Sequence, residues 1–287
     1  MNVLTLTACL CLAGDSIVAC GQKFKIDAPV VLWSDRGGFD AYKAGEAAVQ
    51  AEKKKGYDLR NGLDDKATLE ALRETVDQFV LHYDVCGTSK VCFKVLKDRG
   101  LSVHFMLDLD GTIYQSLDLR ERAWHATIAN GRSIGVEIAH IGAYSLDAVP
   151  DKLVDWYAKD ADGKTRITIP KRFGEQKWRD PNFIPRPRRP DPIVGEVQGK
   201  KLRMYDLTPE QFDSLVKLAA GLAKAFPKIK LDYPRDAAGK LVPRKLADDE
   251  FRKFSGVLGH FHVQLNKTDP GPALDWDALI MQARKVP

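Results

Sequence analysis

The hydrophobic pattern in the first half of the chain predicts helices that alternate with strands. Residues 67–83, "ATLEALRETVDQFVLHY", begin with apolar positions at helical spacing and become continuously apolar over Phe79–Leu81. A helix that leads into a strand covered on both faces gives this pattern. Residues 92–100, "CFKVLKDRG", then predict a short helix that ends at Gly100.

Two strand patterns follow. Residues 101–115, "LSVHFMLDLDGTIYQ", place the tight-turn pair Asp110-Gly111 between two β-rich runs and predict a hairpin. Residues 133–140, "SIGVEIAH", alternate in period two. One face of this predicted strand is apolar, and the other carries Glu137 between two small residues.

The second half of the chain continues the alternation. Residues 207–226, "LTPEQFDSLVKLAAGLAKAF", predict an amphipathic helix with Thr208 as N-cap, Pro209 in its first turn and Gln211 in a capping box. "SGVLGH" predicts a short strand that ends at His260, and Asp275 caps a C-terminal helix. We therefore expect an α/β fold with a mixed central β-sheet flanked by helices, in one domain over residues 23–287.

An insertion over residues of about 143–203 interrupts this alternation. Within it, residues 151–201 hold thirteen Lys and Arg against eight Asp and Glu, a surplus equal to the net charge of +5 of the whole chain. The stretch 181–192, "PNFIPRPRRPDP", is too rich in proline to form a helix. We expect an extended, basic, Pro-rich excursion on the surface.

Composition excludes some classes of protein. A hydrophobic content of 44% and a charged content of 29% are those of an ordinary globular protein, and +5 over 287 residues is too mild for a nucleic-acid binder. We expect a monomer that binds no nucleic acid.

The N-terminal 22 residues have two interpretations. They begin apolar, and "IVAC" (17–20) resembles a bacterial lipobox, which would make Cys20 a lipid anchor. No basic residue precedes the apolar run, and Ser16–Ala19 also fits the start of a strand. We expect export to the periplasm or cell envelope rather than a cytoplasmic location, with the anchor and the strand as alternatives.

Candidate chemistry gathers where predicted strands end. His82 and His260 both end apolar strands, and strand ends are where open α/β sheets present their sites. Residues 259–276, "GHFHVQLNKTDPGPALDW", add Lys267 and Asp269, which lie on the same side of an extended run. Two histidines and a carboxylate leave a fourth tetrahedral position for water, which is the arrangement of a catalytic zinc site.

The same stretch resembles the C-terminal motif of the zinc-dependent N-acetylmuramoyl-L-alanine amidases of type 2, relatives of the peptidoglycan recognition proteins. "FVLHYD", "VHFMLDLDGTIYQSLD", "AWHA" and "SIGVEI" resemble further segments of that family, in the family's order. The resemblance covers about 75–145 and 204–285, and it implies the family's α/β fold.

The resemblance also implies a set of roles. His82, His260 and Asp269 match the family's ligands for one Zn²⁺ per chain, Glu137 matches its catalytic acid/base, and Lys267 matches the residue that stabilises the transition state. The implied reaction is hydrolysis of the amide between N-acetylmuramic acid and L-alanine in peptidoglycan or muropeptides. Alternatives are a non-catalytic muropeptide-binding module and a cytoplasmic amidase that recycles anhydro-muropeptides.

Some positions depart from the family or remain open. The interval from His260 to Asp269 is one residue shorter than the commoner family spacing, which leaves His262 as a rival ligand. His104 is expected to pack at the sheet, and His140 is expected to be structural.

The resemblance suggests two further groups of residues. Trp124, His125 and Asn130 are candidates for the substrate groove, although His125 also fits a role in orienting a loop. Cys86 and Cys92 resemble a small disulfide loop that follows the first zinc ligand in recognition proteins.

The basic insertion suggests one more hypothesis. Because peptidoglycan stems carry carboxylates, Arg186, Arg188 and Arg189 would hold the enzyme on the cell wall by charge attraction.

Overall fold

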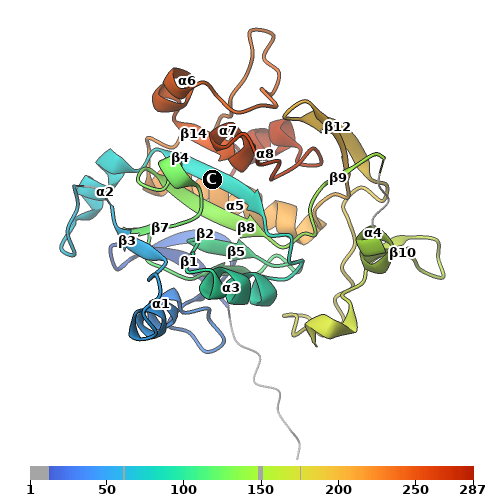
Figure 1. The fold of residues 1–287 in the computed structure, drawn as a ribbon, viewed down its shortest axis with the longest axis horizontal. Coiled ribbons are helices and arrows are strands. Elements are labelled where there is room, and N and C mark those ends of the chain that lie inside the picture. The colour runs from blue at the N-terminus through green and yellow to red at the C-terminus, as the bar shows by residue number, and fades with distance from the viewer. Residues whose placement is uncertain (1–12, 61, 148–150, 175) are drawn as a thin grey trace, which may run out of the picture.

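A seven-stranded mixed sheet forms the centre of the protein, which a computed structural model describes over residues 13–60, 62–147, 151–174 and 176–287 (Figure 1). Neighbouring strands β5, β8, β4 and β14 run parallel, so their carboxyl ends lie at one edge of the sheet. The predicted fold class is confirmed. Across the sheet the strands are β1 (Gly14–Ala19), β2 (Gln22–Leu32), β6 (Ile113–Gln115), β5 (Phe105–Leu107), β8 (Ser133–Ile138), β4 (Gln78–Tyr83) and β14 (Gly256–Gly259).

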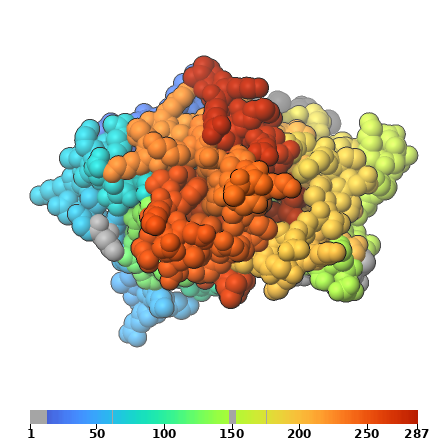
Figure 2. Space-filling model, turned by 90° about the horizontal axis from the view of Figure 1, so that it is seen from above, coloured from blue at the N-terminus to red at the C-terminus, as the bar shows by residue number. Residues whose placement is uncertain are grey.

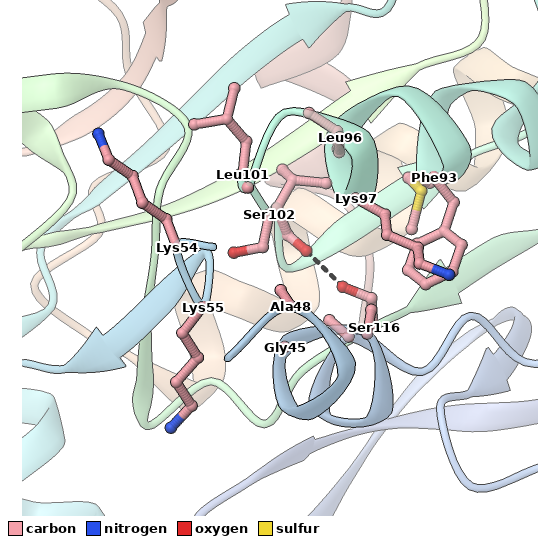
Figure 3. A pocket seen from close by; sticks show the side chains of 15 residues that line it. Gly45, Ala48, Lys54, Lys55, Phe93, Leu96, Lys97, Leu101, Ser102 and Ser116 are labelled. Carbon is pink, nitrogen blue, oxygen red and sulfur yellow. Dashed lines mark hydrogen bonds between the residues drawn. The ribbon is translucent and has the colours of Figure 1, made fainter. Parts of the chain in front are cut away.

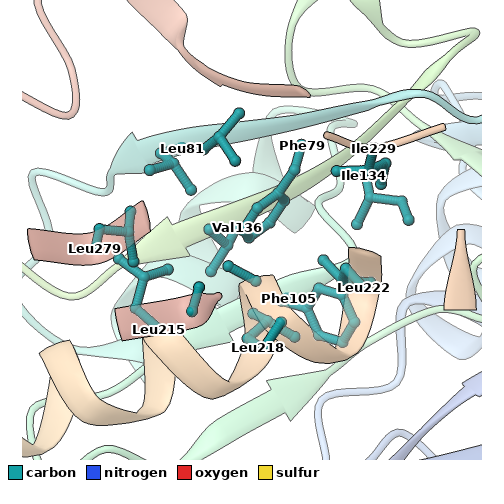
Figure 4. Packing of buried hydrophobic residues seen from close by; sticks show 14 of the residues in the cluster. Phe79, Leu81, Phe105, Ile134, Val136, Leu215, Leu218, Leu222, Ile229 and Leu279 are labelled. Atoms are coloured by element: carbon teal, nitrogen blue, oxygen red, sulfur yellow. The ribbon is translucent and has the colours of Figure 1, made fainter. Parts of the chain in front are cut away.

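One face of the sheet packs on α5 (Pro209–Ala225) and α8 (Trp276–Ala283). Figure 4 shows side chains of β4, β5 and β8 pointing at the apolar side of α5, and each such fully buried side chain stabilises the fold by about 1.5–3 kcal/mol. The predicted start of α5 is confirmed, because the Thr208 hydroxyl accepts from Gln211 N and the Gln211 side chain accepts from Thr208 N.

The opposite face is covered by α3 (Ser89–Asp98), which packs beside α1 (Ala41–Gln50). The cavity between these helices has a volume of about 20 Å³, enough for roughly one water molecule (Figure 3). Helix α3 begins three residues before the predicted start, because Thr88 caps it. Helix α2 (Leu69–Thr75) leads into β4 as predicted, while β3 (Tyr57–Leu59) pairs with β7 (Glu121–Ala123) outside the main sheet.

The insertion lies beside the sheet, at the right of Figure 1 and yellow in Figure 2. Residues 181–192 contain no helix, as predicted. The elements of the insertion are β9 (Tyr144–Ser145), α4 (Asp151–Trp156), β10 (Tyr157–Lys159), β11 (Thr165–Ile167), η2 (Lys171–Phe173), β12 (Ile193–Val197) and β13 (Lys200–Met204).

The three arginines of the insertion do not form the free cationic surface that the sequence suggested. Arg186 forms an ion pair with Asp160. Arg188 and Arg189 both donate to the carboxylate of Asp206, at 3.1 and 2.7 Å. The side chain of Asp206 is buried, and two cations beside it offset the cost of burying its charge. These ion pairs reduce the free positive charge of the three arginines, and wall anchoring stays a prediction.

The N-terminal hairpin confirms the strand interpretation of Ser16–Ala19. Strand β1 pairs with β2, and the turn between them is fixed because the Asp118 carboxylate accepts from the backbone of Cys20 and Gly21, at 2.7 and 2.8 Å. Residues 1–12 lie outside the described residues. None of the helices described is long and apolar enough to cross a membrane. Lipid attachment at Cys20 would require removal of β1 and stays a prediction.

Candidate active site

Three buried side chains converge at the carboxyl edge of the sheet. His82 lies at the end of β4, and His260 begins α7 (His260–Val263) directly after β14, the parallel neighbour of β4. His82 Nδ1 and His260 Nδ1 lie 2.9 Å apart, and Asp269 Oδ2 lies 3.0 and 2.9 Å from them. These three residues, the metal triad, are the one group of His, Cys, Asp and Glu in the described part of the chain that could hold a metal ion.

The outer nitrogens of both histidines are occupied in a way that suits a metal. His260 Nε2–H donates to Gln264 Oε1 at 2.5 Å, which leaves the lone pair of Nδ1 directed at the triad. His82 Nε2 lies 2.9 Å from His125 Nδ1, and His125 Nε2 lies 3.2 Å from the Ser133 hydroxyl. Second partners of this kind orient metal-ligating histidines. Two imidazoles and a carboxylate are a donor set that fits Zn²⁺.

Burial and neighbouring groups shift the pKa values of His82 and Asp269. Burial, followed by the nearby His260, lowers the pKa of His82 to about 4, so this imidazole is neutral at pH 7. Burial alone would raise the pKa of Asp269, but the close contacts of its carboxylate with His260 and His82 outweigh burial and lower that pKa. A neutral imidazole and an ionised carboxylate are the forms that bind a cation.

Glu137 and Lys267 border the same cavity, which has a volume of about 160 Å³. Parallel pairing of β4 with β8 sets Glu137 in register with His82, so both side chains leave the sheet on the same face. Burial, then the negative charges of Asp269 and Asp84, raise the pKa of Glu137 well above its ordinary value. Glu137 Oε2 has no hydrogen-bond partner, as suits a group that exchanges a proton with a substrate.

The turn that carries Lys267 and Asp269 packs against the insertion. Met204 in β13 fills the space beside Gly271, where a Cβ would lie 2.4 Å from the Met204 sulfur. A Cβ on Gly195 in β12 would lie 2.8 Å from Pro272. The Arg189 guanidinium donates to the carbonyl of Ala273. We call residues 267–273 the ligand turn; side chains and backbone of the insertion hold it from one side.

The remaining histidines take structural positions. His262 is fully buried; its Nδ1 accepts from Gly259 N and its Nε2 donates to the Val242 carbonyl, both at 2.9 Å. Both nitrogens are thus occupied, and His262 as a rival ligand is excluded. His104 is buried in the sheet as predicted, and His140 bonds the Tyr205 carbonyl as a structural residue.

Of the three residues predicted to contact the substrate, two line the metal cavity and one does not. Trp124 and His125 line the metal cavity. Asn130 does not; it is buried, and its side-chain oxygen accepts from the backbone of His125 and Ala126 at 3.1 and 2.6 Å. Asn130 therefore fixes the loop that presents His125, and its assignment to the substrate groove is wrong.

The structure describes Cys86 and Cys92 as free thiols whose side chains contact each other, so it does not show the predicted disulfide. The loop between them is closed by other means: Asp84 Oδ1 accepts from the backbone of Cys86 and Gly87, both at 2.9 Å. Trp156 of the insertion packs directly on Gly87, where a Cβ would lie 2.3 Å from its ring.

Sequence reasoning missed three supporting residues. Arg60 is fully buried and donates to the carbonyls of Leu119 and Ser133, among others, beneath the loop that holds His125. Gln264 and Asp84 complete the surroundings of the triad. The lone Arg60 in a polar stretch gave no signal, since its partners are backbone carbonyls distant in sequence.

Buried histidines and a carboxylate beside a glutamate and a lysine, at the edge of a mixed α/β sheet, define a hydrolase site of the kind that cleaves amides. A family model described as N-acetylmuramoyl-L-alanine amidase matches residues 72–272, and the chain belongs to this type 2 amidase family. It is an N-acetylmuramoyl-L-alanine amidase, an enzyme of peptidoglycan amide hydrolysis.

Solved structures of low sequence identity also match. A selenomethionine derivative of AmpD has 16% identity and a TM-score of 0.38, covering 80% of this chain and 90% of that chain. The amidase AmiD from E. coli, in complex with anhydro-N-acetylmuramic acid-L-Ala-D-γ-Glu-L-Lys, has 18% identity and a TM-score of 0.41, covering 80% and 66%. The endolysin LysCS from Clostridium intestinale has 16% identity and a TM-score of 0.38, covering 74% and 86%. Comparison with curated proteins finds no match.

Proposed function

We propose that this amidase hydrolyses the amide between N-acetylmuramic acid and L-alanine with one zinc ion held by His82, His260 and Asp269. The convergence of two Nδ1 atoms and one carboxylate oxygen within 3.0 Å of one another supports this proposal. Zinc bound there would polarise the scissile carbonyl and lower the pKa of an attacking water.

The residues of the cavity supply the proton transfers and further charge stabilisation. Glu137 takes a proton from the attacking water and returns it to the leaving amine as the C–N bond breaks, so the products are a lactyl carboxylate and a free L-alanine amine. Lys267, half-buried at the same cavity, stabilises the negative charge that develops on the carbonyl oxygen.

Glu137 and Lys267 argue against a non-catalytic binding module. A module that only holds a muropeptide has no need of a buried, unpartnered glutamate oxygen beside a metal triad. The muropeptide bound to AmiD, anhydro-N-acetylmuramic acid-L-Ala-D-γ-Glu-L-Lys, is a suitable substrate for this chain as well.

We also propose that the enzyme is exported and acts at the cell envelope, which the apolar start of the sequence supports. Cell fractionation and the N-terminal sequence of the mature protein test this. A cytoplasmic enzyme that keeps its N-terminus would instead support the recycling alternative.

Mass spectrometry of products tests the proposed activity. The purified, zinc-loaded enzyme should release the tripeptide L-Ala-D-γ-Glu-L-Lys from that muropeptide, and a chelator should stop the release until zinc is restored. Release of any other fragment, or activity that survives chelation, would contradict the proposal.

A further inference from the structure

The tip of the β12–β13 hairpin in the insertion reaches the segment that carries the metal ligand His260. The two strands (β12 at the upper right of Figure 1) are joined by the turn Gln198-Gly199, whose φ angles of 55° and 70° are both positive. Such two-residue turns favour asparagine, aspartate or glycine at the first position. The backbone of the turn therefore does not call for glutamine, which points to a role for the side chain of Gln198.

The amide of Gln198 binds two other segments of the chain. Its Nε2 donates to the carbonyls of Phe261 and Gln264, at 2.9 and 3.0 Å, although these residues lie 63 and 66 positions further along the chain. Its Oε1 accepts from Lys245 N at 3.0 Å, in the segment that leads to α6 (Asp248–Lys253). Both ends of the amide are thus bound, and the hairpin tip is fixed to α7 and to the start of α6.

Helix α7 is too short to be stable on its own. It has four residues, and Gln264 N donates to the His260 carbonyl at 3.0 Å to close its single turn. Isolated helices of this length do not persist in water, so α7 depends on its neighbours. The Gln198 amide donates to one carbonyl within α7 and to one directly after it, and on another side α7 contacts η1 (Thr127–Ala129).

Gln264 connects the hairpin tip to the metal triad. Its carbonyl accepts from Gln198, and its side-chain Oε1 accepts from His260 Nε2–H at 2.5 Å. The same carbonyl accepts from Lys267 N, the first residue of the ligand turn, at 3.2 Å. The position of Gln264, and with it the direction of the His260 ring, therefore depends on the Gln198 amide.

We propose that Gln198 is a positioning residue for the metal triad, which holds α7 and Gln264 so that His260 Nδ1 faces Asp269. This inference rests on the proposed zinc site. Gln198 does not border the metal cavity, so it acts through Gln264 rather than on a substrate. Partners that orient a ligating histidine raise metal affinity, because less order has to be gained when the metal binds.

Zinc affinity, measured by competition with a chelating dye, tests this proposal. Gln198→Gly removes the amide and keeps the turn, because glycine adopts positive φ without strain. We expect the Kd for zinc to rise about tenfold, the lower end of the range for residues that support metal ligands. Gln176→Gly is the matched control: Gln176 lies in the same insertion, donates to the carbonyls of Phe173 and Gly174, and should leave the Kd unchanged. An unchanged Kd in Gln198→Gly would overturn the proposal.

A double-variant cycle separates positioning from a general loss of stability. Gln264→Leu removes the acceptor for His260 Nε2–H, so in that background Gln198→Gly should change the Kd for zinc by less than about twofold. An equal, tenfold loss of affinity in both backgrounds would show that Gln198 supports the fold at large, and would also overturn the proposal.

Histidine NMR of the metal-free protein distinguishes this inference from the proposed function. The His260 Nε2–H proton should exchange slowly with solvent in the parent and in Gln176→Gly, and faster in Gln198→Gly, because Gln264 no longer holds it. Equal exchange rates in the parent and Gln198→Gly would contradict the positioning role. Faster exchange in Gln198→Gly, with a parent that binds no zinc, would refute the proposed function and leave the role of Gln198 in holding His260 intact.

Discussion

The two halves of the active site are held by different means. His82, Glu137 and His260 stand at the ends of parallel strands, so the hydrogen-bond ladders of the sheet fix their positions. Lys267 and Asp269 stand on the ligand turn, outside the strands; this turn packs on the insertion as well as on Tyr83 and Gly259 at the ends of β4 and β14. The contrast implies that a peripheral, basic insertion takes part in placing a metal ligand.

Arginines that contribute to the positive charge of the insertion make contacts within the protein. Arg189 connects the buried carboxylate of Asp206 to the carbonyl of Ala273, four residues beyond Asp269. These arginines thus form ion pairs and hydrogen bonds within the protein. Variants in the sheet and in the ligand turn test whether the two parts contribute differently to the site.

The largest effect is expected for the sheet-borne ligand. His260→Ala should abolish zinc binding, because one of three protein ligands is lost, whereas His262→Ala should retain about one equivalent, since both nitrogens of His262 bond the backbone. Metal analysis by mass spectrometry measures both. Zinc lost from His262→Ala and kept by His260→Ala would reverse the ligand assignment.

Glu137→Gln should lower the rate of hydrolysis without loss of the bound metal. We expect zinc content and fold to persist while kcat falls by about 10²–10⁴, the usual range for a general acid/base. Muropeptide turnover with parallel metal analysis checks this. Near-parental kcat would remove Glu137 from the mechanism.

The insertion is tested by a matched pair of arginines. Arg189→Gln should weaken zinc binding about tenfold, the lower end of the range for residues that support ligands, because the ligand turn loses a tether. Arg186→Gln, in the same Pro-rich segment, pairs only within the insertion and should leave zinc affinity unchanged. Competition with a chelating dye measures both zinc affinities. Equal affinities in the two variants would show that the insertion does not help to place the metal ligand.

A smaller effect should appear on acidification. Burial lowers the pKa of His140 to about 4, against about 6.5 in an unfolded chain, so the unfolded state binds more protons between these values and stability falls as pH falls. The stability advantage of the parent over His140→Gln should therefore shrink by about 1 kcal/mol per pH unit from 6.5 toward 4. Urea unfolding at several pH values measures it, and a constant difference would contradict a neutral, buried His140.

The smallest effect is expected for the cysteines. Because Asp84 closes their loop, a reductant should leave Tm unchanged, and thiol labelling should modify the half-buried Cys86 before the buried Cys92. A Tm that drops on reduction, with neither thiol labelled beforehand, would show a disulfide.

The sequence was informative where local pattern and sheet geometry coincide. Period-two alternation placed Glu137 on the correct face, and strand ends placed His82 and His260 together. The capping box of α5 was readable because its partners are three residues apart. The Arg189–Ala273 contact was not, since it joins positions 84 residues apart, and a charge-rich segment looks the same whether its arginines face solvent or a buried carboxylate.

We propose that the strand-end residues and the ligand turn meet at one zinc ion. Anomalous diffraction at the zinc edge from crystals of the zinc-loaded enzyme tests it directly. We expect a single strong peak about 2.0–2.2 Å from His82 Nδ1, His260 Nδ1 and an oxygen of Asp269. A peak bound by other side chains, such as the free thiols of Cys86 and Cys92, or no peak at the triad, would contradict it.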